Sequence, residues 1–230
     1  MLGNCRVDFP PYGLSGAVYG ALLNHRPQLD ALGDAAWQPP HKQPPQAPVL
    51  EVKPRHMFTP HGGTVRVPSG VQALTVGASL GIVIGRTACR VAVDEALAHV
   101  AGYLIVGDLS LPLDSHYRPG ARLKARDGFC PLGPAVTPAA AIADPDALAV
   151  RVRVDGKTAQ QTDTAERVRG VAQLIADVSE FMTLQPGDVL ALGIAQGSPL
   201  VKAGSQVELE IAGLPSLAFD LLAEDEEVQR

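Results

Sequence analysis

The sequence predicts an α+β domain dominated by β-structure, and three observations support this. Short apolar runs bounded by Gly, Pro or Asp recur along most of the chain, which is typical of strands. Only residues 164–184 show apolar positions every three or four residues over the length of a long helix. Hydrophobic residues make up 46% of the chain but aromatic residues only 4%, so we expect a core of Ala, Val, Leu and Ile.

The amino-terminal part divides into three segments by composition. Residues 1–16 contain Pro and Gly and are interpreted as an extension. Residues 17–48 hold an expected strand at 18–23, a short helix after Pro27 and a connector, residues 38–48, whose five prolines exclude a helix or a central strand. The main domain is then residues 49–230.

The main domain begins with strand patterns. We expect strands at residues 49–52 and 65–68, and the run 71–85 is apolar enough to be buried on both faces. A short helix is expected at residues 95–100, with Asp94 as its N-cap.

Residues 103–134 are the segment in which we expect the chemistry. Residues 103–106 read as a buried strand, and Gly107 is expected to turn the backbone so that Asp108 faces a cavity. Lys124 and Asp127 follow, three positions apart. A cation and two acids are therefore expected to converge here.

The carboxyl-terminal half is predicted to be mostly strands. Residues 149–154 alternate apolar residues with Arg151 and Arg153, and Asp155-Gly156 is typical of a hairpin turn. We interpret both arginines as lying on a solvated face. The helix at 164–184 follows, and three further strands are expected at 189–192, 207–211 and 217–222.

The bulk properties exclude several classes of protein. The net charge is −5 and no basic cluster is visible, which argues against a nucleic-acid partner. No apolar run reaches the roughly 18 residues of a membrane span, and no signal pattern opens the chain, so we expect a cytoplasmic protein. The three cysteines lack metal spacing and suggest reduced thiols; Cys130 is interpreted as a packing residue, with a catalytic thiol as the alternative.

Asp108, Lys124 and the run DGFCPLGP at residues 127–134 resemble the signature of the fumarylacetoacetate hydrolase family. The resemblance extends from about residue 18 to residue 222 and implies the mixed β-sandwich roll of that family, whose members pair as dimers or double modules. Within the family, the segment resembles the amino-terminal half of the bifunctional decarboxylase/isomerase of 4-hydroxyphenylacetate breakdown.

The resemblance implies a divalent metal, Mg²⁺ or Mn²⁺, held by an E-x-E pair and the strand-end Asp. Gly77 and Ser79 stand in the places of the two glutamates, so only Asp108 is retained as a ligand. Hard cations need several oxygen ligands, and one carboxylate with a hydroxyl is a poor set. We therefore expect weak metal binding or none.

The family's lid carries a His and a Glu three residues on, which act as base or activate water. Gln28 and Ala31 fall in those places here, and neither takes a proton at neutral pH. His25 and Asp30 lie nearby and are candidate substitutes, although His25 beside Pro27 also reads as a plain surface histidine.

The family's glycine loop, which contacts the substrate carboxylate, corresponds to residues 192–197. Leu192 and Ile194 replace its two hydroxyl residues, while Gly193 and Gly197 keep the backbone turn and remain candidates for substrate binding.

Lys124 and Asp127 are the catalytic candidates that the resemblance implies. The alternatives are that Lys124 forms a structural ion pair and that Asp127 is a turn residue. Arg118 is a further candidate for binding substrate, and His116 could support the site from a distance.

Two functions from different classes follow. The first is an enzymatic module of the decarboxylase/isomerase, forming a homodimer or a heteromer with an intact second subunit. The second is a catalytically silent subunit that only pairs with and positions such a partner. A weaker third is a small-dicarboxylate-binding protein that uses Lys124 and Arg118.

Overall fold

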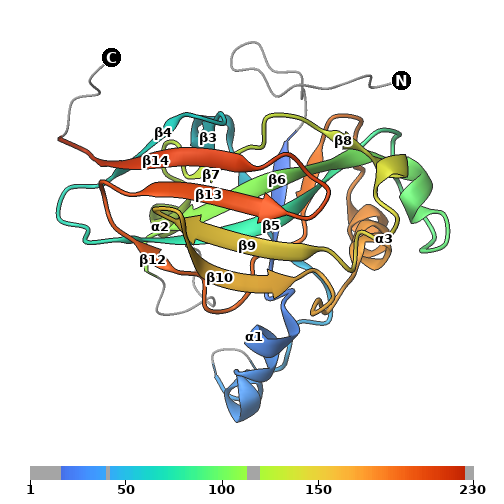
Figure 1. The fold of residues 1–230 in the computed structure, drawn as a ribbon. Coiled ribbons are helices and arrows are strands. Elements are labelled where there is room, and N and C mark those ends of the chain that lie inside the picture. The colour runs from blue at the N-terminus through green and yellow to red at the C-terminus, as the bar shows by residue number, and fades with distance from the viewer. Residues whose placement is uncertain (1–16, 40–41, 113–119, 226–230) are drawn as a thin grey trace.

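The computed structural model describes residues 17–39, 42–112 and 120–225. Two β-sheets stack face to face, with α3 (Val171–Phe181) beside one end and α1 (Arg26–Asp30) projecting from the body (Figure 1). The predicted β-dominated α+β class is confirmed. The expected extension, residues 1–16, lies outside the described residues.

The first sheet has seven strands and carries the site described below. Its order is β2-β1-β11-β5-β6-β8, with β12 also pairing with β5. The bounds are Val49–Lys53 for β2, Val18–Leu22 for β1, Val189–Ala191 for β11, Leu74–Ile84 for β5, Val100–Ser110 for β6, Thr137–Pro138 for β8 and Leu200–Val201 for β12.

The second sheet has five strands in the order β10-β9-β13-β14-β4. Its strands are Lys157–Asp163 for β10, Ala149–Val154 for β9, Gln206–Ile211 for β13, Leu217–Ala223 for β14 and Thr64–Val67 for β4. Asp155 and Gly156 have φ values of 50° and 75°, which confirms the predicted hairpin turn. Arg151 and Arg153 pair with Glu210 on the outer face, as expected for a solvated surface.

Short elements complete the domain. Two of these are strands that pair with each other, β3 (Phe58–Thr59) and β7 (Cys130–Pro131). The remaining helical elements are α2 (Ala121–Lys124) and four 3₁₀ helices, η1 (Gly33–Trp37), η2 (Arg55–Met57), η3 (Ala96–His99) and η4 (Ala139–Ala141). In the described part of the predicted connector, residues 42–48 contain no helix or strand, as its prolines predict.

The core lies between the two sheets and is built mainly from aliphatic side chains, as predicted. The central strand β5 is buried at all but one of its eleven positions, since both of its faces are covered. Its antiparallel partner β6 is buried from Gly102 onward. This central pair is therefore a rigid base for any side chain that it carries.

Three predicted features differ from the structure. The helix begins at Val171 rather than at residue 164, because Asp146 accepts a hydrogen bond from the Val171 N–H while Asn24 binds the backbone of residues 168 and 169. The expected backbone turn at Gly107 is also wrong. Strand β6 runs straight through to Ser110, and the missing side chain of Gly107 instead makes room for Pro131.

Near residue 95 the helical segment is only a 3₁₀ turn, η3. Its N-cap is Glu95 rather than the predicted Asp94, and no side chain caps it.

Candidate functional site

The register of the central strand pair places Asp108 directly opposite Gly77. Residues 77 and 108 are antiparallel partners, and Asp108 is 5% exposed. Directly opposed residues project to the same face of a sheet. Asp108 therefore lies across from residue 77, the position where the resemblance places the first of the two glutamates.

Four buried or partly buried charged side chains form a closed ring around this point. The Lys53 ammonium lies 2.6 Å from Glu51 Oε1 and 2.8 Å from Asp108 Oδ1. The Lys124 ammonium lies 2.8 Å from Glu51 Oε1 and 3.1 Å from Asp108 Oδ2. Each lysine forms an ion pair with both carboxylates, so positive and negative charges alternate and cancel. We call these four residues the charge ring.

The charge ring stabilises its own ionised state. Burial alone would raise the pKa of Asp108, but the ammonium groups of Lys53 and Lys124 outweigh burial and hold it at about 2. Burial alone would lower the pKa of Lys53, but the negative charges near it, Asp108 foremost, raise it above its usual range. Both groups are therefore charged at neutral pH.

The space beside Gly77 is filled. A β-carbon built on Gly77 would lie 2.5 Å from Ile194 Cγ2, so the isoleucine occupies the volume that a side chain at residue 77 would need. The hydroxyl of Ser79 accepts a hydrogen bond of 2.9 Å from the Gly193 N–H. Residues 77 and 79, where the resemblance expects the two glutamates, therefore both pack against or bond to the loop that follows β11.

The donor set around Asp108 does not fit a hard divalent metal. Both Asp108 oxygens and Glu51 Oε1 already accept hydrogens from ammonium groups, and Ser79 is engaged with the loop. Within residues 17–39, 42–112 and 120–225, no cluster of three His, Cys, Asp or Glu side chains could hold a metal ion. Hard cations favour several free carboxylate or carbonyl oxygens, which this group does not offer.

An open cavity of about 180 Å³ lies next to the charge ring. Lys124 is the charged side chain in its lining, and the other polar side chains are amides or hydroxyls: Gln28, Thr75, Ser110, Gln196 and Ser198. Its apolar lining comes largely from residues 21–23, Ile194 and Ala195. The cavity is therefore polar and nearly neutral, with one ammonium at its edge.

The structure separates the two predicted catalytic residues. Lys124 is buried in the charge ring, whereas the Asp127 side chain is 95% exposed and lies 4.0 Å from His56. The prediction that Asp127 joins Lys124 and Asp108 is therefore wrong. The second acid beside Lys124 is Glu51. Arg118 and His116 lie outside the described residues.

The glycine loop keeps its predicted backbone turn. Gly193 and Gly197 have φ values of 98° and 77°, a region that glycine adopts without strain. A β-carbon on Gly193 would also lie 2.6 Å from the Ala21 carbonyl oxygen. Of the two, Gly197 lines the cavity.

His25 is not the plain surface residue that its neighbouring proline suggested. It is 4% exposed; its Nδ1 accepts a hydrogen bond from the Gln196 N–H at 3.1 Å, and its Nε2 lies 3.3 Å from Glu166. Burial first, and then the nearby positive charge of Arg167, lowers the pKa of His25. The imidazole therefore joins the glycine loop to the segment before α3, while the other candidate substitute, Asp30, is exposed.

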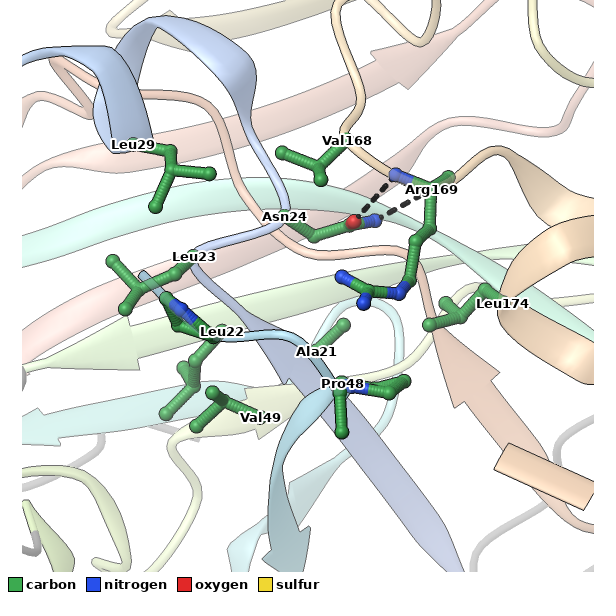
Figure 2. Close-up of a pocket in the computed structure, with 12 residues that line it drawn as sticks. Ala21, Leu22, Leu23, Asn24, Leu29, Pro48, Val49, Val168, Arg169 and Leu174 are labelled. Atoms are coloured by element: carbon green, nitrogen blue, oxygen red, sulfur yellow. Dashed lines mark hydrogen bonds between the residues drawn. The ribbon is translucent and has the colours of Figure 1, made fainter. Parts of the chain in front are cut away.

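Asn24 anchors the segment between β1 and α1 (Figure 2). Its side-chain amide donates to the carbonyls of Arg169 and Leu192, and its side-chain oxygen accepts from the Arg169 N–H, each at 2.9 Å. Leu23 just before it has a φ of 55°, which is rare for a leucine. These bonds explain how that backbone conformation is kept.

Cys130 lies beside the charge ring but is poorly suited to act as a nucleophile. It is fully buried, and burial raises the pKa of its thiol to about 12. This supports the packing interpretation.

Glu51 and Lys53 are the functional residues that sequence reasoning missed. They are two positions apart on a strand and so project from the same face, a signal that the sequence does contain. The reach of Lys53 to β6 depends on Gly20 of the neighbouring strand, where a β-carbon would lie 3.1 Å from Lys53 Cε. That dependence is visible only in three dimensions.

Comparison with known proteins agrees with this fold. The family profile described as fumarylacetoacetate (FAA) hydrolase C-terminal matches residues 17–221. The 4-hydroxyphenylacetate degradation bifunctional isomerase/decarboxylase of Salmonella dublin is 39% identical over 213 residues, which are 93% of this chain and 48% of that protein. The chain thus spans about half the length of the curated bifunctional relatives that it matches.

Comparison with solved structures also finds proteins with this fold. The 2-hydroxyhepta-2,4-diene-1,7-dioate isomerase of Mycobacterium marinum has a TM-score of 0.77 at 26% identity, over 93% of this chain and 77% of that one. A maleylpyruvate hydrolase of Sphingobium sp. SYK-6, solved with manganese(II) ion and pyruvate, has a TM-score of 0.73 at 26% identity, over 90% and 70% of the two chains. Among the described residues, no helix is long and apolar enough to cross a membrane. On its fold, its profile match and its relatives, the chain belongs to the fumarylacetoacetate hydrolase family.

Proposed function

We propose that this chain is the non-catalytic half of a decarboxylase/isomerase of 4-hydroxyphenylacetate degradation, acting in the cytoplasm with a partner subunit or domain that keeps the metal site. The observation that carries the proposal is the filled site beside Asp108. Ile194 occupies the volume that a glutamate at residue 77 would need, and both carboxylates of the charge ring are already neutralised. The relatives, which are about twice as long, support a second half elsewhere.

The reactions assigned to the complete enzyme are decarboxylation of 5-oxopent-3-ene-1,2,5-tricarboxylate and isomerisation of 2-hydroxyhepta-2,4-diene-1,7-dioate. In the partner, a divalent metal would act as a Lewis acid that stabilises an enolate. This chain would contribute a rigid sandwich that pairs with the partner and orders its active-site loops. Lys124 and Asp108 would serve the fold rather than the reaction.

The test is a mixing experiment. Decarboxylation is followed by ultraviolet absorbance with the isolated chain, with a family member that keeps both E-x-E glutamates, and with the two together, each with Mn²⁺ and with EDTA. We expect no turnover by the isolated chain and activity of the mixture above that of the partner alone. Turnover by the isolated chain with Mn²⁺, or a partner indifferent to its addition, would contradict the proposal.

A second candidate function is metal-free binding of a small dicarboxylate. The cavity of about 180 Å³ favours it, because Lys124 lies at its edge and several hydroxyl and amide groups line it. Calorimetric titration with succinate and glutarate in EDTA tests this function. Saturable binding that Lys124→Met abolishes would support it, and the absence of heat with the folded protein would exclude it.

A further inference from the structure

We propose that His25 is a pH-sensitive anchor of the glycine loop. While its imidazole is neutral it holds Gln196, and when the imidazole takes up a proton it releases this end of the loop. Gln196 and Gly197 line the open cavity of about 180 Å³ that Lys124 also lines. The ionisation of one buried histidine therefore sets how firmly a wall of that cavity is held.

The hydrogen bonds of His25 define which form of the ring anchors the loop. The Gln196 N–H is a backbone group that can only donate, so His25 Nδ1, 3.1 Å away, has to be the nitrogen without a hydrogen. The single ring hydrogen then lies on Nε2, which is 3.3 Å from Glu166 Oε2. A second proton, on Nδ1, brings two donors face to face, and the bond to the loop is lost.

Two other anchors of the glycine loop do not titrate. The Gly193 N–H donates to the Ser79 hydroxyl, and the Gln196 carbonyl accepts from the side-chain amide of Gln160, each at 2.9 Å. Hydroxyl and amide groups keep one protonation state near neutral pH, whereas an imidazole does not. Among these contacts, the bond from Gln196 to His25 is the one through which pH acts on the loop.

The backbone places Arg167 beside the imidazole. Residues 25 and 167 form an antiparallel bridge, in which opposed side chains project to the same side. Arg167 is 4% exposed, and its Nε and Nη1 have no hydrogen-bond partner among the described residues. Burying a guanidinium with unused donors is unfavourable. Stability therefore does not explain its position, and its effect on His25 does.

The charges that face His25 come from two elements. Glu166 and Arg167 belong to the segment before α3, and Asp163 ends β10, whereas residues 192–198 include no charged side chain. Burial first, and then Arg167, lowers the pKa of His25, and together they outweigh the opposite effect of the two acids. Arg167 therefore opposes a second positive charge beside it and keeps the anchor closed at neutral pH.

The inference goes beyond the proposed function and holds for the isolated chain. Its tests use neither substrate, metal nor partner. Failure of the mixing experiment and failure of the tests below are therefore separate results.

The first test follows the ring and the loop together by NMR of the ¹³C,¹⁵N-labelled chain, from pH 8 down to the onset of acid unfolding. We expect the ring hydrogen on Nε2 at pH 8, and one shared midpoint below 6.5 for the His25 ring and the Gln196 amide. The Gly193 amide is the internal control and should not follow that midpoint. A Gln196 amide that ignores the ionisation of His25, or a ring that stays neutral until the protein unfolds, would overturn the proposal.

His25→Gln separates the titration from the contact itself. A glutamine side chain can accept from the Gln196 N–H but does not ionise, so the Gln196 amide should no longer titrate. If that amide titrates as before, its pH response belongs to another group and the assignment to His25 is wrong.

The second test changes the charges next to the ring. Arg167→Met should raise the shared midpoint by about 0.5–1 pH unit, whereas Arg167→Lys keeps the charge and should leave the midpoint near its original value. Arg86→Met, at an exposed position on another element, is the matched control and should cause no shift. Glu166→Gln, at a side chain that is 53% exposed, should lower the midpoint and decides the test if Arg167→Met does not fold. A midpoint that neither substitution moves would contradict the proposal.

Discussion

Ile194 occupies the space in which a side chain at Gly77 would lie. A β-carbon on Gly77 would approach Ile194 Cγ2 to 2.5 Å and Ile194 Cβ to 2.8 Å, closer than such atoms pack in proteins. The two residues come from different elements, β5 and the loop after β11. An acid at residue 77 and an isoleucine at residue 194 therefore exclude each other.

This exclusion predicts a reciprocal effect on stability. Gly77→Ala should destabilise the protein by about 1–3 kcal/mol, because the added methyl group overpacks against Ile194. Ile194→Ala, combined with it, should recover much of that loss by opening the space. Urea unfolding of both single variants and the double variant measures the coupling. Equal losses from Gly77→Ala with and without Ile194 would refute the exclusion.

Asn24 should contribute more to stability than an exposed amide does. Its side chain makes three hydrogen bonds in a buried position, and truncation would leave backbone groups of Arg169 and Leu192 without partners. Asn24→Ala should therefore cost roughly 2–4 kcal/mol, with faster hydrogen exchange at the Arg169 amide. Gln72→Ala, at an exposed position, is the matched control and should change little.

Much of the architecture follows from local pattern, whereas the site does not. Strand β5 and the hairpin at Asp155-Gly156 are predictable because burial and turn chemistry act within a few residues. The start of α3 is not, because the apolar period continues back to Val168 while Asn24, more than 140 residues away in sequence, takes the backbone of Arg169. The choice between helix and loop is made there by a distant side chain.

The candidate site shows the same division. Asp108 and Lys124 stand out in sequence as an acid and a cation, and the structure brings them together. The spacing of Glu51 and Lys53 places them on one face of a strand, but the sequence does not show that this face meets Asp108, because that depends on where β2 lies relative to β6. Asp127 is misleading for the opposite reason, since it is close to Lys124 along the chain but faces solvent.

The pH dependence of stability should include a contribution from His25. Its folded-state pKa is lowered from 6.5, so the unfolded chain binds a proton there first as the pH falls. The contribution of His25 to the free energy of unfolding is therefore complete above 6.5, the pKa of His25 in the unfolded chain. It is lost as the pH drops below 6.5 and through the lower pKa of the folded state. The charged groups around the imidazole are Arg167, Glu166 and Asp163.

Urea unfolding between pH 5 and 8 measures this contribution. The loss on acidification should be smaller in His25→Gln, and it should remain in His56→Gln, whose side chain is 48% exposed. An unchanged pH profile in His25→Gln would contradict the assignment.

The two described cysteines should differ sharply in reactivity. Burial raises the pKa of Cys130 to about 12, so at pH 8 only about one molecule in 10⁴ carries its thiolate, whereas Cys89 is exposed. Iodoacetamide should modify Cys89 in the folded protein and reach Cys130 only in denaturant, as peptide mass mapping would show. Fast labelling of Cys130 in the native state would mean that the region around the charge ring opens readily.

Removal of the charge should cost much more stability at Lys124 than at Asp127, although only three positions separate the two residues. Lys124→Met leaves Glu51 and Asp108 with one ammonium group between them, so it should cost about 3–5 kcal/mol of stability. Asp127→Asn changes a carboxylate that is 95% exposed and should stay within about 0.5 kcal/mol of the unmodified protein. Thermal unfolding measures both variants under identical conditions.

In the mixing assay, Asp127→Asn should support the partner as well as the unmodified chain does. A loss of mixed activity in Asp127→Asn without a loss of stability would instead assign its exposed carboxylate to the partner contact or to the reaction.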